Sequence, residues 1–254
     1  MTQLTKEFNQ KKIEEAALSI SGLTFAYPKQ GEILKNLNLR IHSGERVGLI
    51  GANGSGKTTL FLLVCGILTP ISGKIQLFDK PVETGAFRSE MGLVFQNPDD
   101  QLFTTSVRDD VAFGPENMNL DAEEVENRVR KALSVTGVEE LIDRVPQNLS
   151  GGEKCMVAIA SVLAMQPQII LYDEPTANLD LRARRRLIRF LQNSQETYII
   201  STHDLEMILE VCDRVLLLDE GQIIADGNPR EVMGDKQLME AHGLEKPHSL
   251  TPHR

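Results

Sequence analysis

Cysteine is scarce in this chain of 254 residues, and the three that occur, Cys65, Cys155 and Cys212, are far apart. No two of them form a Cys-x-x-Cys pair, which excludes the usual sequence patterns of a zinc site and of a disulfide framework. We therefore predict three reduced thiols that pack as small hydrophobic residues, as is usual in cytosolic proteins.

Long hydrophobic runs are also lacking. The longest apolar-rich stretch, Leu60–Leu68, is far too short to span a bilayer and indicates a buried helix. The first residues, MTQLTKEFNQKKIEE, are polar and mixed in charge, unlike a secretory signal. The formal net charge is −9, without the basic stripe that binds nucleic acid, so we expect no nucleic-acid partner.

The negative charge is concentrated in residues 97–127, where nine acidic residues stand against the single basic residue Arg108, a local charge of −8. Such a cluster indicates either an ordinary solvated surface or a docking face for a basic partner, and the sequence leaves both open. The acidic residues are Asp99, Asp100, Asp109, Asp110, Glu116, Asp121, Glu123, Glu124 and Glu126.

Three apolar runs without polar alternation predict strands that are covered on both faces: Arg46–Ile50, Gln168–Asp173 and Thr197–Thr202. Helix-like patterns separate them, so the predicted fold class is α/β with a mostly parallel central sheet. Residues 214–227 predict a hairpin with a short acidic turn that contains Gly221.

The segment from about residue 96 to 166 has helix patterns and no clear strand, which indicates a helical lobe inserted into the α/β core. One of its helices is predicted to begin at Asp121, with Glu124 placed as in a capping box. Residues 1–16 and the tail from about residue 240 are expected to be mobile ends.

The clearest motif is GANGSGKT at residues 51–58, a Gly-x-x-x-x-Gly-Lys-Thr pattern between a predicted strand and a predicted helix. Backbone N–H groups of such a phosphate loop wrap around the phosphates of a nucleotide. Lys57 is placed to reach the β- and γ-phosphates, and Thr58 is placed to give a hydroxyl ligand to Mg²⁺.

The run IILYDEP supplies acidic residues for the same chemistry. It delivers Asp173 to the carboxyl end of a predicted strand, the end at which the phosphate loop also opens, where it would hold Mg²⁺ or its waters. Pro175 indicates a turn, so Glu174 can face the γ-phosphate and orient the attacking water as general base.

A second, incomplete cradle is LSGGE, residues 149–153, where two glycines stand at the mouth of a helix-like apolar run. Backbone N–H groups at the start of a helix bind anions. This motif has no Lys-Thr pair, so it cannot hold a phosphate and a metal by itself. The chain therefore carries one complete phosphate site and one incomplete site.

These motifs occur in the order phosphate loop, LSGGE, YDEP, the NLD that ends at Asp180, and His203 after a strand. In this order they resemble the nucleotide-binding subunit of an ABC transporter, over about residues 18–230. The resemblance implies an ATP hydrolase with a RecA-like P-loop NTPase core, an antiparallel β part for the nucleotide base and an inserted helical subdomain. The implied layout is a single ABC ATPase domain, 1–240, with its core in 17–95 and 167–230 and the helical signature subdomain in 96–166, then a short tail, 241–254.

In this family two subunits bind head to tail, and the signature of one covers the ATP held by the phosphate loop of the other. The half site is thereby explained: ATP joins the dimer and its hydrolysis releases it. Both half-sites look intact, which favours a homodimer, and a heterodimer with a sister ATPase stays open. The resemblance implies ATP and Mg²⁺ as cofactors, with ATP contacts at Tyr27, Gly51, Asn53, Gly54, Ser55, Gly56, Lys57, Thr58, Thr59, Ser150, Gly151, Gly152 and Asp180.

Four roles follow from positions that match the family. Tyr27 resembles the aromatic residue that stacks on adenine, with an ordinary core or surface tyrosine as the alternative. Gln96 resembles the loop glutamine that contacts Mg²⁺ or the lytic water, and His203 the switch histidine on the γ-phosphate. Asp180 resembles the loop acid that crosses the dimer, and it is equally suited to cap the helix that follows. No role is assigned to the remaining histidines, apart from weak metal binding by the last three: His42, His242, His248 and His253.

The stretch Gly92–Leu120, with NPDDQLF and DVAFGPEN, closely resembles energy-coupling-factor ATPases, the cobalt, nickel and vitamin uptake group. This resemblance implies a transmembrane coupling protein, a substrate-binding membrane protein and a peripheral location on the cytoplasmic face of the membrane. In that group the coupling protein presents short helices that bear arginines. We expect an acidic face to suit them, formed by Asp99, Asp100, Asp109 and Asp110.

One departure from the family follows the signature, where Cys155 and Met156 stand in place of the usual basic residue, which puts a contact behind that helix in doubt. Alternatives are the ATPase of a conventional ABC importer or exporter, or a soluble ABC ATPase that acts on nucleic acid. The latter usually has coiled-coil insertions or tandem cassettes. A non-catalytic binding module is disfavoured because Lys57, Glu174 and His203 are all present.

Overall fold

The structure is a computed structural model that describes residues 16–177 and 179–251. The N-terminal end for which mobility is predicted therefore lies outside the described residues, apart from Ala16. The chain divides into two compact units. One comprises Met1–Phe87 and Gln195–Arg254, and the other comprises Arg88–Ser194.

The first unit contains an antiparallel sheet with strand order β2-β1-β4-β5. The second half of β2 alternates between buried and exposed residues, as expected for a sheet with one covered face. This sheet matches the antiparallel part that the family resemblance implies. The strands are β1 (Ala16–Ala26), β2 (Glu32–His42), β4 (Ser72–Leu77) and β5 (Lys80–Pro81).

The same unit contains a mostly parallel group of strands with the order β10-β9-β3-β8. The central strand β3 pairs in parallel with β8 and β9, while β9 and β10 form the predicted hairpin. Three of the five β3 residues are aliphatic and 0% exposed, which explains its continuous apolar sequence. The strands are β3 (Arg46–Ile50), β8 (Thr197–Ser201), β9 (Arg214–Asp219) and β10 (Gln222–Gly227). The helices of this unit are α2 (Lys57–Val64), α7 (Leu205–Val211), α8 (Pro229–Val232), α9 (Lys236–Ala241) and the 3-10 turn η4 (His248–Leu250).

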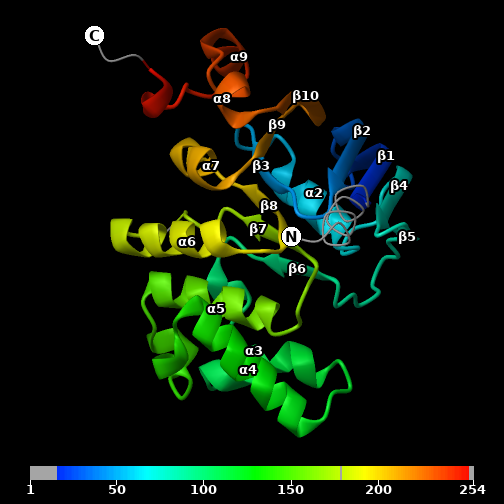
Figure 1. The fold of residues 1–254 in the computed structure, drawn as a ribbon. Helices are drawn as coiled ribbons and strands as arrows, with labels where there is room; N and C mark the ends of the chain where they lie inside the picture. Colours follow the sequence, from blue (N-terminus) through cyan, green and yellow to red (C-terminus); the bar gives the residue numbers. More distant parts are fainter. Residues whose placement is uncertain (1–15, 178, 252–254) are drawn as a thin grey trace, which may run out of the picture. The chain divides into compact units, whose positions relative to one another are not determined.

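The second unit combines two parallel strands with helices, and α3, α4 and α5 pack together in it (Figure 1). The helix predicted to begin at Asp121 does so, because the Asp121 carboxylate accepts a hydrogen bond from the N–H of Glu124 at 2.8 Å. Glu124 does not complete a capping box and instead pairs with Arg128. The elements are β6 (Met91–Val94), η1 (Pro98–Asp100), α3 (Val107–Glu116), α4 (Ala122–Thr136), η2 (Glu139–Leu141), η3 (Pro146–Asn148), α5 (Gly151–Leu163), β7 (Ile169–Asp173) and α6 (Leu181–Asn193).

Residues 240–251 are not the loose end that the sequence predicts for the tail. Met239 and Pro247 are buried, and the Lys246 ammonium donates to the carbonyl of Gly234 at 2.7 Å. Two apolar side chains and a few long-range hydrogen bonds thus hold a segment whose composition looks like that of a solvated end. Its partners are distant in sequence, so composition alone does not reveal them.

The acidic surface is also smaller than predicted, because Asp110 is only 4% exposed. Its Oδ1 accepts hydrogen bonds from the backbone N–H groups of Phe103 and Thr104 at 3.0 and 3.1 Å. Burial raises the pKa of Asp110 despite these donors. Asp110 is therefore a structural residue that fixes the turn before α3, and it is no part of a docking face.

Replacing Asp110 by alanine should lower the free energy of unfolding by about 2 kcal/mol, because two backbone donors lose their buried acceptor. Asp110→Asn keeps an acceptor oxygen and should stay within about 1 kcal/mol of the parent. Urea unfolding of the three proteins measures both values. Because the pKa of Asp110 is raised, the parent should gain stability relative to Asp110→Asn as the pH falls, and a loss would contradict this assignment.

Candidate nucleotide-binding site

The phosphate loop connects the end of β3 to the start of α2. Gly51 tolerates no side chain, because a Cβ there would lie 2.1 Å from the carbonyl oxygen of Leu218. Ser55 is 6% exposed, and its buried hydroxyl has no hydrogen-bond partner among the described residues. A buried polar atom in that state points to a missing ligand. The loop therefore fits a bound phosphate group, as the sequence predicts.

Lys57 is the first residue of α2, and its side chain turns back over the loop. Its ammonium donates to the carbonyl oxygens of Gly51 at 2.8 Å and Ala52 at 3.2 Å. The residue is 7% exposed, so a cation is held beside the phosphate cradle by the cradle's own backbone. Thr58, the predicted hydroxyl ligand of Mg²⁺, is exposed, as are Asn53 and Gly54.

Tyr27 follows β1 directly and reaches the same helix. Its hydroxyl lies 3.3 Å from the hydroxyl oxygen of Thr59, and its ring packs edge-on against Phe25 with a centroid distance of 4.9 Å. Tyr27 is thus half-buried next to the phosphate loop, where an adenine-stacking role remains a prediction.

His203 follows β8, the parallel neighbour of β3. Leu49 pairs with Ser201 in register, so the phosphate loop and His203 leave the same edge of the sheet. His203 is exposed, and the next turn is fixed by the Thr202 hydroxyl, which accepts from the N–H of Asp204 at 3.0 Å. The first unit therefore brings the phosphate loop, Tyr27 and His203 to neighbouring places.

The second unit arranges its predicted residues by the same rule. Val94 of β6 pairs in parallel with Tyr172 of β7, so Gln96 and Asp173 follow the carboxyl ends of adjacent strands. Asp173 is 5% exposed and Glu174 is 8% exposed. Glu174 has a φ of 45°, a left-handed conformation that non-glycine residues rarely adopt. The predicted turn at Glu174 is confirmed.

The LSGGE motif forms the start of α5, where Ser150 and Glu153 form a capping box that was not predicted from the sequence. The Ser150 hydroxyl accepts from the N–H of Glu153 at 3.4 Å, and the Glu153 carboxylate accepts from the N–H of Ser150 at 2.8 Å. The Ser150 hydroxyl also donates to this carboxylate, at 2.7 Å, and this bond together with the one from the Ser150 N–H lowers the pKa of Glu153. Sequence reasoning missed Glu153, although the Ser-x-x-Glu spacing is the signal for a capping box.

The second glycine of the motif packs against α6. A Cβ at Gly152 would lie 2.5 Å from the Cβ of Ala183, so glycine is needed for this close approach. Asp180 caps α6 by accepting from the N–H of Ala183 at 2.8 Å. The capping role considered for Asp180 is therefore confirmed, while its role across a dimer stays a prediction.

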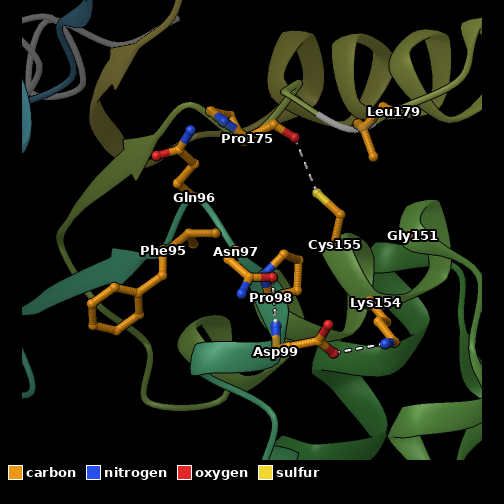
Figure 2. Close-up of a pocket in the computed structure, with 11 residues that line it drawn as sticks. Phe95, Gln96, Asn97, Pro98, Asp99, Gly151, Lys154, Cys155, Pro175 and Leu179 are labelled. Atoms are coloured by element: carbon orange, nitrogen blue, oxygen red, sulfur yellow. Dashed lines mark hydrogen bonds and ion pairs between the residues drawn. The ribbon is translucent and has the colours of Figure 1, made fainter.

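A cavity of about 150 Å³ lies between the start of α5, the loop after β6 and the loop after Glu174 (Figure 2). Cys155 donates through its thiol to the carbonyl oxygen of Pro175 at 3.6 Å, and Lys154 pairs with Asp99 at 2.6 Å. Burial raises the pKa of the Cys155 thiol to about 12. Cys155 and Met156, which stand in place of the family's usual basic residue, are therefore both buried. Cys155 packs as the small hydrophobic thiol that the sequence predicts. The cavity brings Gln96 and Gly151 to one lining.

Within the described part of the chain, no three His, Cys, Asp or Glu side chains are grouped so as to hold a metal ion. Weak metal binding by the tail histidines finds no support there, and His253 lies outside the described residues. The predicted Mg²⁺ ligands are the Asp173 carboxylate, the Thr58 hydroxyl and the Gln96 amide oxygen, which are of the kind that Mg²⁺ prefers, and this role stays a prediction. Among the residues described, no helix combines the length and apolar character needed to cross a bilayer.

Comparison with known proteins agrees with this geometry. The family model described as ABC transporter matches residues 34–177, which is more than half of the chain. The chain belongs to the ABC transporter family of ATP-binding proteins. Members of this family bind ATP and hydrolyse it to power transport, so the predicted enzyme class and the predicted fold are confirmed.

Several relatives of this ABC ATPase cover nearly its whole length. A putative ABC transporter ATP-binding protein of Synechocystis is 57% identical over 92% of this chain and 82% of its own. The energy-coupling factor transporter ATP-binding protein EcfA of Methanocaldococcus jannaschii is 43% identical over 89% of this chain and 84% of its own. The solved structure of cbiO1 from Clostridium perfringens, described as part of the ABC transporter complex cbiONQ, has a TM-score of 0.80 and 40% identity, covering 90% of this chain and 94% of that one. The resemblance to the energy-coupling-factor group is thereby confirmed.

Removal of the Glu153 side chain should weaken the start of α5. Glu153→Ala loses the acceptor for the Ser150 N–H, and the free energy of unfolding should fall by about 1 kcal/mol. Because the pKa of Glu153 is lowered from its ordinary value of 4.5, the carboxylate's contribution should be complete above that pH and be lost as the pH falls through the lowered pKa. Urea unfolding against Glu153→Gln, which keeps an acceptor oxygen, isolates this titration. A difference that grows in acid would contradict the assignment.

Proposed function

We propose that this chain is the ATP-hydrolysing subunit of an energy-coupling-factor type ABC importer. The observation that carries the proposal is the stretch Gly92–Leu120 in a chain whose near full-length relatives include EcfA proteins and cbiO1. Uptake of cobalt, nickel or a vitamin is the corresponding cargo prediction, and the selection of that cargo belongs to membrane subunits.

The proposed chemistry assigns one task to each group. Backbone N–H groups of the phosphate loop and the Lys57 ammonium bind the β- and γ-phosphates of ATP. Glu174 accepts a proton from the attacking water, and its fixed left-handed backbone limits the directions in which its carboxylate can point. His203 and Gln96 contact the γ-phosphate and the water, and Tyr27 stacks on the adenine.

Mg²⁺, held by Thr58, Asp173 and Gln96, would neutralise charge that develops on the phosphate oxygens during cleavage. In this proposal its protein ligands are a hydroxyl, a carboxylate and an amide oxygen, a hard oxygen set suited to that ion.

We further propose that two chains complete each other's sites. The start of α5 offers backbone N–H groups at a helix N-terminus, where an anionic γ-phosphate is stabilised. This half-site would cover an ATP held by the phosphate loop of another subunit, with Asp180 at the dimer contact. Both halves keep their motifs in this chain, which favours two identical copies.

The membrane partner is proposed to dock beside α3. Phe103 and Phe113 are 63% and 50% exposed, and their rings form an edge-on pair with a centroid distance of 5.0 Å. Three exposed acidic residues lie within a few positions of the pair in the sequence: Asp100, Asp109 and Glu116. An aromatic patch with acidic residues close to it in the sequence suits a short helix that carries apolar and arginine side chains, because apolar burial gives affinity and the charges give orientation.

The role of Glu174 is tested by Glu174→Gln. The amide cannot accept the proton, so phosphate release should fall by a factor of about 100 or more, while the Kd for ATP stays within a few-fold. Phosphate release and equilibrium nucleotide binding by the purified complex measure the two effects. Glu139→Gln, at an exposed position on η2, serves as the matched control. Undiminished phosphate release by Glu174→Gln would remove it from the proposed chemistry.

The docking proposal is tested by the double variant Phe103→Ser with Phe113→Ser, tagged and purified from gently solubilised membranes. The parent should bring with it a coupling membrane protein and a small substrate-binding membrane protein, and the variant should lose at least about nine-tenths of both. Val135→Ser, another exposed apolar position in the same unit, should retain them. Co-purification of conventional permease subunits by the parent would overturn the proposed transporter type.

A further inference from the structure

The C-terminal segment, defined here as residues 236–251, is fastened to the strand that ends beside the phosphate loop. Nδ1 of His242 lies 2.7 Å from Oδ2 of Asp219, the last residue of β9, and both side chains are about three-quarters buried, at 22% and 24% exposed. A separation of this length fits an imidazole N–H that donates to a carboxylate. From the sequence, only weak metal binding is considered for His242, and no role is predicted for Asp219.

β9 is the strand against which the loop begins. Ile50, directly before the loop, pairs in parallel with Leu217. The next residue of β9 is Leu218. Its carbonyl oxygen would lie only 2.1 Å from a Cβ on Gly51, too close for any side chain there. Asp219 is therefore one residue beyond the backbone that limits the start of the phosphate loop.

The segment also approaches the loop itself. A Cβ built on Gly243 would lie 3.8 Å from the Cβ of Ala52, an ordinary van der Waals separation. Ala52 is the second residue of the loop, and its carbonyl oxygen accepts from the Lys57 ammonium at 3.2 Å. Gly243 has no side chain, so the segment lies near Ala52, a residue that accepts from Lys57, with room left for a methyl group between them.

The other end of the segment is attached to the helix that follows His203. The backbone N–H of Ser249 donates to Oε1 of Glu206 at 3.1 Å, in the first turn of α7. The Lys246 ammonium fixes the middle of the segment through the carbonyl of Gly234 at 2.7 Å, away from the loop. The segment is consequently joined both to the end of β9 beside the phosphate loop and to the helix that follows His203.

We infer that His242 and Asp219 are positioning residues for ATP binding, which fasten residues 236–251 to the end of β9 and so hold the Leu218 carbonyl that limits the start of the phosphate loop at Gly51. Neither residue has to touch the nucleotide in this role. The inference rests on the proposed function of residues 51–58 as the phosphate loop.

The test is equilibrium binding of the fluorescent analogue trinitrophenyl-ATP to the full-length chain. His242→Ala should raise the Kd about tenfold, and the KM for ATP should rise with little change in kcat, because the loop is less well placed before binding while the chemical groups are unchanged. Asp219→Asn should act in the same direction. The double variant should bind no more weakly than either single one, since both substitutions break one contact.

Two controls separate positioning from simple structural damage. Lys246→Met removes the hydrogen bond to Gly234, which does not involve the loop. It should leave the Kd unchanged even where it lowers the Tm as much as His242→Ala does. His242→Asn offers an amide N–H in place of Nδ1–H and should restore at least half of the lost affinity. An unchanged Kd in His242→Ala, or an equal rise in Lys246→Met, would overturn the inference. The proposed loop itself is checked by Lys57→Ala, which should abolish binding whatever His242 does.

Discussion

Parallel pairing of strands is the constraint on which the arrangement of the functional residues depends. Parallel neighbours present their carboxyl ends at one edge of a sheet, so residues far apart in sequence emerge together there. The pairing of β3 with β8 brings the phosphate loop and His203 to one edge, and the pairing of β6 with β7 does the same for Gln96 and Asp173. The strands are continuously apolar because they are covered on both faces, which leaves the chemistry to the loops after them.

Backbone geometry also helps to fix the positions of the functional residues. Gly51 and Gly152 each lie where a Cβ would overlap a neighbouring atom. Only glycine at these positions lets the phosphate loop approach β9 and the LSGGE motif approach α6. Glu174 adopts a left-handed φ that costs free energy and persists because the surrounding residues bury it. Such strain falls at the residue predicted to act as general base, next to the carboxylate predicted to bind Mg²⁺.

Local patterns were sufficient to predict the strands β3, β7 and β8, the hairpin, the phosphate loop and the turn at Glu174, because each depends on neighbours in sequence, while β2, β4, β5 and β6 were not predicted from them. The burial of Asp110 could not be predicted, since its environment depends on the turn at Phe103 and on the packing of α3 within its unit. The same holds for His242, whose partner Asp219 is 23 positions away and belongs to a strand. The role of Glu153, in contrast, could have been predicted, because the Ser-x-x-Glu spacing indicates a capping box. The adjacent glycines indicate phosphate binding instead, and the cap was missed. The roles of the individual site residues on ATP remain predictions.

The central claim is that one chain carries two half-sites and completes them with a second copy around ATP. Light scattering of the full-length chain tests it most directly, with saturating ATP and with EDTA present so that the absence of Mg²⁺ blocks hydrolysis. The account predicts the monomer mass without nucleotide and twice that mass with ATP, returning to the monomer mass when ATP is removed. A monomer mass at a nucleotide concentration shown to saturate binding would contradict it.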